Sequence, residues 1–152
     1  DDETFETLRP YLAAAATEIT HCGGIGTGQV VKLLNNMLLI QSVVALGEAL
    51  TIGERAGVDR ALLVDTLSKG SADSFALRNH VKKAMLPRDF PVGAFGTDYA
   101  TKDIAYALEL ANDAGVKSPA GELAKEMLEK TSAAGYGAEY FPVLLKLIEG
   151  ER

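Results

Sequence analysis

The sequence has one cysteine and only two histidines. Cys22 has no partner for an internal disulfide, and a cysteine-based zinc site is excluded. His21 and His80 are too few for a metal cluster, so we expect no metal site. The chain also begins with acidic residues, Asp1 to Glu3, where a signal peptide needs a positive region. Together these features predict a reducing, cytoplasmic setting.

Basic residues are outnumbered: 15 Lys and Arg stand against 21 Asp and Glu, for a formal net charge of −6. The acidic residues are scattered along the chain rather than clustered. Binding to a phosphate backbone requires a basic face, so we expect no nucleic-acid partner. A small anionic ligand is not excluded by this balance, because it needs only one or two local cations.

The chain also lacks an uninterrupted apolar run long enough for a membrane span. The most apolar window, residues 30–50, is interrupted by polar side chains. These are Lys32, Asn35, Asn36, Gln41 and Glu48. A membrane span rarely tolerates so many polar residues near its centre. The window therefore predicts a buried helix, and we expect no membrane partner.

Both common nucleotide-binding motifs are missing, although residues 23–36 read GGIGTGQVVKLLNN. A dinucleotide fingerprint needs G-x-G-x-x-G, but Gln29 or Val31 stands where the third glycine is required. The P-loop pattern fails too, because no Gly-Lys-Ser/Thr follows. The glycines therefore need another explanation.

What the sequence does contain is helical periodicity. From Gly28 to about Arg55 there is no proline and apolar residues occupy every face. Such a helix would be roughly 42 Å long. It should be buried on all sides and contact a second domain or subunit, and Gly57 should end it.

Boundary signals after residue 57 predict further helices and no strand. They are 59–67 with Asp59 as cap, about 71–85, 97–115, a helix from Pro119 to about 135, and 140–148, with a loop at 86–96. Ser118 and Glu122 are candidates for a capping box. The fold class predicted for residues 23–152 is all-α, a helical bundle around one long central helix.

Residues 1–22 differ in kind from the remainder. Thr4 is a candidate cap for a helix reaching about Ala16, and TEITHC, residues 17–22, favours a short strand. A lone strand has no pairing partner in this chain. We therefore interpret residues 1–22 as the helix-strand remnant of a preceding, truncated α/β domain.

Lys32 and Asn36 carry the clearest chemistry. At spacing i, i+4 they lie on one face of the long helix, close to its N-terminus. That face suits a substrate with a carboxylate and a neighbouring hydroxyl, the ammonium sitting where a proton is exchanged. We expect apolar neighbours to desolvate Lys32 in part, which favours proton exchange near neutral pH. The alternative is a surface lysine on a helix beside an asparagine that caps a loop.

Two sequence blocks resemble the β-hydroxyacid dehydrogenase family, which includes 3-hydroxyisobutyrate dehydrogenase and tartronate semialdehyde reductase and is related to 6-phosphogluconate dehydrogenase. The first is G-x-G-x-x-x-K-x-x-x-N, present as Gly26, Gly28, Lys32 and Asn36. The second is GAFGTDYATKDIAYAL, residues 93–108. Both occur in the family's order and spacing, and the resemblance covers essentially the whole chain.

The resemblance implies a function and a set of site residues. Lys32 would be the general acid/base, with Asn36 and the backbone of Gly28 binding a small hydroxyacid. Phe95, Lys102 and Asp103 would lie at the NAD or NADP cofactor. Without the resemblance, Phe95 would be interpreted as a loop residue filling the core, and the other two as a solvated pair. Relatives that reduce imines replace the lysine, so Lys32 favours hydroxyacid chemistry.

The chain departs from the family in lacking its Rossmann domain. The resemblance therefore implies the C-terminal half of an NAD(P)-dependent 3-hydroxyacid dehydrogenase, with an incomplete cofactor site and no activity on its own. The alternative is a non-enzymatic helical dimerisation module. In either case the apolar long helix and the terminal segment YFPVLLKLI predict a homo-oligomer.

Overall fold

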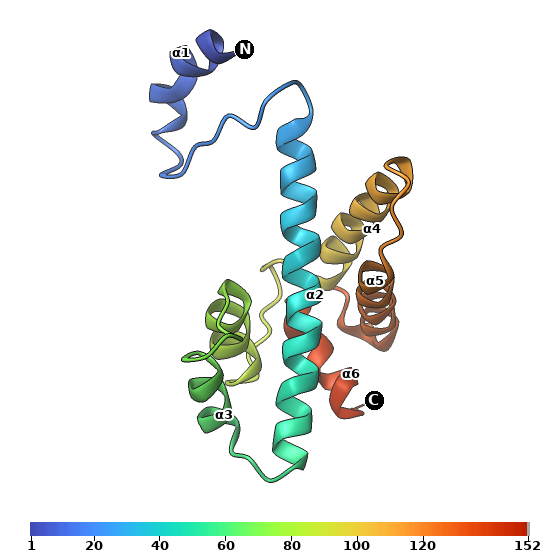
Figure 1. The fold of residues 1–152 in the computed structure, drawn as a ribbon. Coiled ribbons are helices and arrows are strands. Elements are labelled where there is room, and N and C mark those ends of the chain that lie inside the picture. Colours follow the sequence, from blue (N-terminus) through green and yellow to red (C-terminus); the bar gives the residue numbers. More distant parts are fainter. Residues whose placement is uncertain (152) are drawn as a thin grey trace.

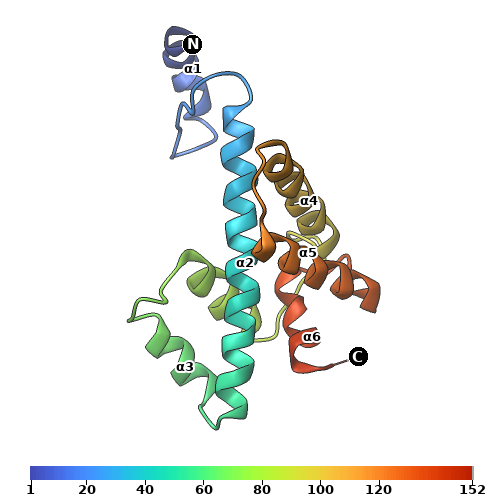
Figure 2. The same cartoon turned by 45° about the vertical axis from the view of Figure 1, so that its right-hand side comes forward.

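The computed structural model describes residues 1–151, and this range forms helices without a strand. The elements in chain order are α1 (Asp2–Leu12), α2 (Thr27–Arg55), α3 (Arg60–Leu67), η1 (Leu77–Met85), α4 (Thr97–Asp113), α5 (Pro119–Thr131), η2 (Ser132–Tyr136), η3 (Phe141–Leu144) and α6 (Leu145–Glu149). In Figure 1, α3 and η1 lie along one side of α2, and α4, α5 and α6 lie along the other. The turned view in Figure 2 shows the same arrangement. The predicted all-α class is confirmed.

Helix α2 has the length that the sequence predicts, beginning at Thr27 and ending at Arg55. Gly57 follows it with φ +90°, the left-handed conformation that ends helices. Residues 1–151 alone do not bury α2 on all sides, and the second domain or subunit expected against it stays a prediction. The buried residues of α2 begin only at Ile40 and share one face, while Val31 and Leu38 are 53% and 60% exposed. Partners also reach α2 beside that face, where Leu63 of α3 packs against Gly53.

By length and composition α2 could also cross a membrane, since its most apolar window has a mean hydropathy of 1.6. Central helices of soluble proteins pass the same test. Here Gly47 of α2 packs closely against the C-terminal helix, where an added Cβ would stand 2.9 Å from Ile148 Cδ1. The absence of a membrane partner stays a prediction.

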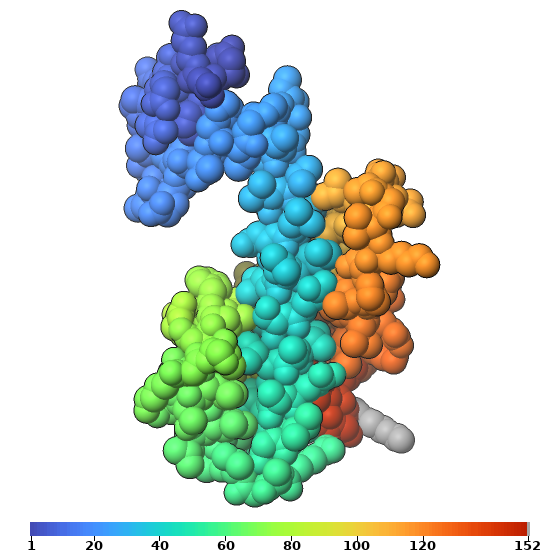
Figure 3. Space-filling view, viewed as in Figure 1, coloured from blue at the N-terminus to red at the C-terminus, as the bar shows by residue number. Residues whose placement is uncertain are grey.

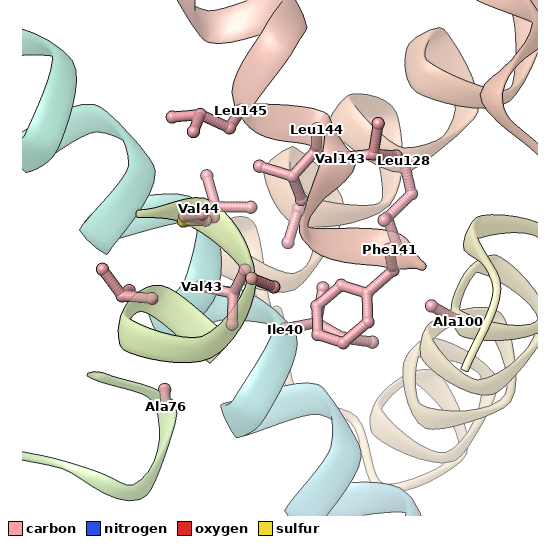
Figure 4. Packing of buried hydrophobic residues seen from close by; sticks show 14 of the residues in the cluster. Ile40, Val43, Val44, Ala76, Ala100, Leu128, Phe141, Val143, Leu144 and Leu145 are labelled. Carbon is pink, nitrogen blue, oxygen red and sulfur yellow. The ribbon is translucent and has the colours of Figure 1, made fainter. Parts of the chain in front are cut away.

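The core surrounds the C-terminal half of α2, which packs against α3 and η1 and against the last third of the chain. Figure 4 shows Ile40, Val43 and Val44 facing Phe141 and its neighbours. Phe141, Val143, Leu144 and Leu145 are fully buried, which explains why so short an apolar segment holds its place. Burial of each such side chain contributes about 1.5–3 kcal/mol. The predicted helix 140–148 is divided into the 3₁₀ turn η3 and the short helix α6. Pro142 stands in the first turn, where its missing N–H costs no helical hydrogen bond.

Residues 1–26 contain two wrong predictions. Helix α1 is capped by Asp1, whose carboxylate accepts from Thr4 N at 2.8 Å, so Thr4 is not the cap. Residues 17–22 do not form a strand, because the chain offers none to pair with it. Instead His21 Nδ1 lies 2.7 Å from Asp2 Oδ1, and its ring stacks on Phe5. Figure 3 shows this segment standing apart from the bundle.

Other boundary predictions have mixed outcomes. Asp59 caps α3 by accepting from Leu62 N at 2.8 Å, as predicted. The capping box at Ser118 is wrong, because Gly121 occupies the third helical position and Glu122 lies one residue beyond it. η1 is wound as a π-helix, and Ser74 accepts from Leu77 N at 3.1 Å near its start.

Candidate active site

Helices α2 and α4 bring three polar side chains together. Lys32 and Asn36 share one face of α2, as their spacing predicts, and Asp103 reaches them from α4. Lys32 Nζ donates to Asp103 Oδ2 at 2.6 Å, and Asn36 Nδ2 donates to the same oxygen at 2.7 Å. One carboxylate oxygen therefore holds both of the residues expected to contact substrate.

The burial of this cluster is uneven. The Asp103 side chain is 3% exposed, whereas the Lys32 side chain is 45% exposed. The ammonium of Lys32 is thus covered on one side by a carboxylate, rather than by the apolar neighbours that the sequence suggests. Its remaining N–H groups face away from that contact and stay accessible. This arrangement fits a lysine that meets a ligand from solvent better than one sealed in the core.

The N-terminus of α2 lies one turn before Lys32. Gly26 is its cap, with φ +92°, and no side chain caps the first turn. Gly28 is exposed, and a Cβ built there would meet nothing within 4 Å. The first N–H groups of a helix lack intrahelical acceptors and carry partial positive charge. The described residues therefore leave this helix end open to an anion.

The residues predicted at the cofactor are not gathered with Lys32, apart from Asp103. Phe95 is half-buried and packs edge-on against Phe141 and Tyr99, at centroid distances of 5.4 and 5.6 Å. This packing agrees with the alternative interpretation of Phe95 as a loop residue that fills the core. Lys102 is exposed, with Nζ 3.7 Å from the Tyr99 ring centroid. Asp103 is buried, so the solvated-pair interpretation is wrong for it.

Sequence reasoning missed a buried polar pair outside this cluster. Tyr140 Oη lies 2.5 Å from His80 Nδ1, and Nε2 of the same imidazole is buried without a partner among the described residues. Burial lowers the pKa of His80 and raises the pKa of Tyr140. No local sequence signal indicates this contact, because the two residues lie 60 positions apart.

The comparisons with known proteins assign the family. A family model described as the NAD-binding domain of NADP-dependent 3-hydroxyisobutyrate dehydrogenase matches residues 26–148. The chain belongs to this family. The match spans both Lys32–Asn36 and Phe95–Asp103, and it confirms the resemblance and the use of NAD or NADP as the cofactor class.

Curated members of the 3-hydroxyisobutyrate dehydrogenase family match nearly the whole chain. 2-(Hydroxymethyl)glutarate dehydrogenase of Eubacterium barkeri is 31% identical over 97% of this chain and 49% of its own length. NAD-dependent L-serine dehydrogenase of Pseudomonas aeruginosa is 30% identical over 98% of this chain and 52% of its own length. Human mitochondrial 3-hydroxyisobutyrate dehydrogenase is 29% identical over 99% of this chain and 46% of its own length. The chain thus spans about half the length of the curated relatives it matches.

Solved structures of the family share the fold. The 3-hydroxyisobutyrate dehydrogenase of Mycobacterium tuberculosis, solved with L-serine, superposes with a TM-score of 0.87 at 27% identity. The superposition covers 97% of this chain and 52% of the Mycobacterium tuberculosis chain. The Salmonella typhimurium protein gives a TM-score of 0.85 at 24% identity, covering 94% of this chain and 50% of that one, and supports the fold alone.

Proposed function

We propose that this chain is the substrate-binding and catalytic half of an NAD(P)-dependent 3-hydroxyacid dehydrogenase, with Lys32 as the general acid/base. The observation that carries the proposal is the cluster of Lys32, Asn36 and buried Asp103 beside the open N-terminus of α2. A helix that served only as scaffold would gain little from holding an ammonium and an amide side by side at an exposed surface.

The chain's own groups divide the work as follows. The substrate carboxylate lies at the N-terminus of α2, where the Gly28 N–H and the helix dipole favour an anion. The Asn36 amide orients the substrate. An ammonium has three N–H donors and Asp103 takes one, so Lys32 keeps two for the reacting oxygen. In reduction Lys32 gives that oxygen a proton, and in oxidation its neutral amine takes the proton back.

NAD or NADP, when bound, supplies hydride transfer at the carbon that bears the hydroxyl. The residues present fit only the reacting end of such a cofactor, where we place Phe95 and Lys102 and where the resemblance also implies Asp103. The sequence has no G-x-G-x-x-G, and residues 1–151 form no sheet to carry a pyrophosphate site. We therefore propose a Rossmann domain elsewhere in the full-length protein, with residues 1–22 as its tail and 23–152 as the all-α catalytic domain.

The names of the relatives suggest a substrate class. 3-Hydroxyisobutyrate, 2-(hydroxymethyl)glutarate and L-serine all carry a hydroxymethyl group on the carbon next to a carboxylate. That group places the reacting oxygen a fixed short distance from the anion, as Lys32 and the end of α2 require. We propose the same class for this protein. A cytoplasmic location stays a proposal, since the human relative's name places that protein in mitochondria.

Steady-state assays of the full-length protein test this proposal. Each of the three hydroxyacids is offered with NAD and with NADP, and the absorbance of the reduced cofactor is followed. We expect turnover of at least one, and Asn36→Ala should raise its KM far more than it lowers kcat. Asn112→Ala, an exposed asparagine of α4, is the matched control and should change neither. No turnover in any of the six combinations would overturn the proposal.

A dimerisation module is the second candidate, and the exposed apolar surface favours it. Val31, Leu38 and Phe75 are each more than half exposed, and Leu38 and Phe75 line one pocket beside α2. Patches of this kind commonly mark protein interfaces. A homo-oligomer is compatible with either function, so turnover rather than oligomeric state decides between them.

A further inference from the structure

Asp103 is the anchored member of the Lys32 cluster. Its carboxylate is 3% exposed, and its neighbours Ala100, Ile104 and Ala107 on α4 are fully buried. An isolated buried carboxylate is strongly disfavoured unless it is paired and hydrogen-bonded. Here one oxygen accepts from an ammonium and an amide on α2. The rigid core therefore fixes the acceptor, and the two donors on α2 adjust to it.

The geometry matters because lysine is flexible. Four rotatable bonds let an exposed lysine populate many conformers, and fixing them costs side-chain entropy. A charge-assisted bond of 2.6 Å to an immobile carboxylate selects one group of these conformers. Because Asn36 binds the same oxygen, the nitrogens that would meet the substrate are kept within two hydrogen-bond lengths of each other.

We propose that Asp103 is a positioning residue, which acts on the reaction through Lys32 and Asn36 and does not contact the cofactor. This inference rests on the proposed function of Lys32, and it replaces the cofactor role that the resemblance implies for Asp103. The carboxylate has an oxygen bonded twice within the protein and almost no exposed surface. Lys102, its neighbour in sequence, is exposed and remains assigned to the cofactor.

A double-mutant cycle on the full-length enzyme tests the inference. The four proteins are wild type, Asp103→Asn, Lys32→Ala and the double variant, each assayed for kcat and for both KM values. Asn is nearly isosteric with Asp, so the change removes the charge and little volume. We expect Asp103→Asn to lower kcat by roughly 10- to 100-fold, the loss typical of a misplaced reacting group.

In the Lys32→Ala background, Asp103→Asn should lower kcat no further, because a residue that acts through Lys32 has nothing left to act on. The KM for the cofactor should stay within about twofold of wild type, while the KM for the hydroxyacid should rise through Asn36. A merely structural role would not move kcat in one background alone.

Two further variants control for folding. Glu109→Gln removes an exposed charge from the same helix and should leave both kcat and the melting temperature unchanged. Asp103→Glu keeps the charge on a longer stem and should retain more activity than Asp103→Asn. If Asp103→Asn does not fold, the cycle is run with Asp103→Glu, with the same lack of additivity expected.

Three results overturn the inference: a full further loss of kcat in the Lys32→Ala background, a raised KM for the cofactor, or an unchanged kcat in a folded Asp103→Asn enzyme. They leave the proposed function standing as long as Lys32→Ala itself lowers kcat by roughly 10²–10⁴-fold. If Lys32→Ala keeps wild-type turnover, the proposed function fails, and the positioning role fails with it.

Discussion

Phe141 should contribute more to stability than any exposed aromatic residue of the chain. Its side chain is fully buried, with ring centroids of Phe95, His80 and Tyr140 at 5.4 to 5.6 Å. Truncation of a buried phenylalanine to alanine costs about 3–5 kcal/mol, because the lost transfer free energy adds to that of the cavity. For a chain of this size the melting temperature should fall by roughly 6–20 °C. Phe141 N also donates to Phe95 O at 3.0 Å, so the segment before α4 should loosen as well.

Phe75→Ala is the matched control, since it deletes the same atoms from a side chain that is 63% exposed. It should change the free energy of unfolding by less than about 1 kcal/mol. Urea denaturation followed by circular dichroism measures both variants, with the slope against urea unchanged if only the native packing is altered. The reasoning is refuted if Phe141→Ala loses less than about 1 kcal/mol, or if Phe75→Ala loses as much as Phe141→Ala.

The remaining predictions concern pH, cofactor binding and assembly. Burial lowers the pKa of His80 below the ordinary 6.5. The unfolded state therefore binds the proton more readily than the folded state. The free energy of unfolding should fall as the pH drops below about 6.5, by up to about 1.4 kcal/mol per pH unit. Urea denaturation across that range should show this dependence in wild type and lose it in His80→Gln; an equal slope in both would contradict it. Residues 1–152 alone should bind neither NAD nor NADP by calorimetry, and micromolar affinity would be the contrary result. The same chain should self-associate in light scattering and Leu38→Glu should weaken this, whereas a monomer at high concentration would refute it.

Local signals predicted the fold where they involve only neighbouring residues. Asp59 as a cap and Gly57 as a terminator act within one helical turn, and the structure confirms both. The strand at 17–22 is wrong because β-branched residues favour a strand only when a partner exists. Residues 1–151 cover less of α2 than its composition suggests, for a related reason. Apolar composition shows which faces of a helix should be covered, but not which segment or partner covers them.

In the candidate site, too, the local pairing could be predicted from the sequence and the long-range contact could not. The pairing of Lys32 with Asn36 follows from the helical repeat alone. The contact of Asp103 with both residues does not follow from it, because that contact depends on where α4 lies against α2. Asp103 lies 71 residues after Lys32 in the sequence. The resemblance named Asp103 but assigned it to the cofactor. Only the structure shows which side chains its carboxylate contacts.

The turnover of Lys32→Ala in the full-length protein tests the central claim most directly. A positioned general acid/base contributes roughly 10²–10⁴-fold, so kcat should fall by that factor. The melting temperature should fall as well, because the buried Asp103 carboxylate loses its ammonium partner and keeps only the hydrogen bond from Asn36. Lys32→Arg should fail nearly as badly, because a guanidinium keeps its proton at neutral pH. Lys117→Ala removes an exposed lysine that forms no ion pair within residues 1–151, and it should keep wild-type turnover. A folded Lys32→Ala enzyme that retains more than about a tenth of wild-type kcat would contradict the account.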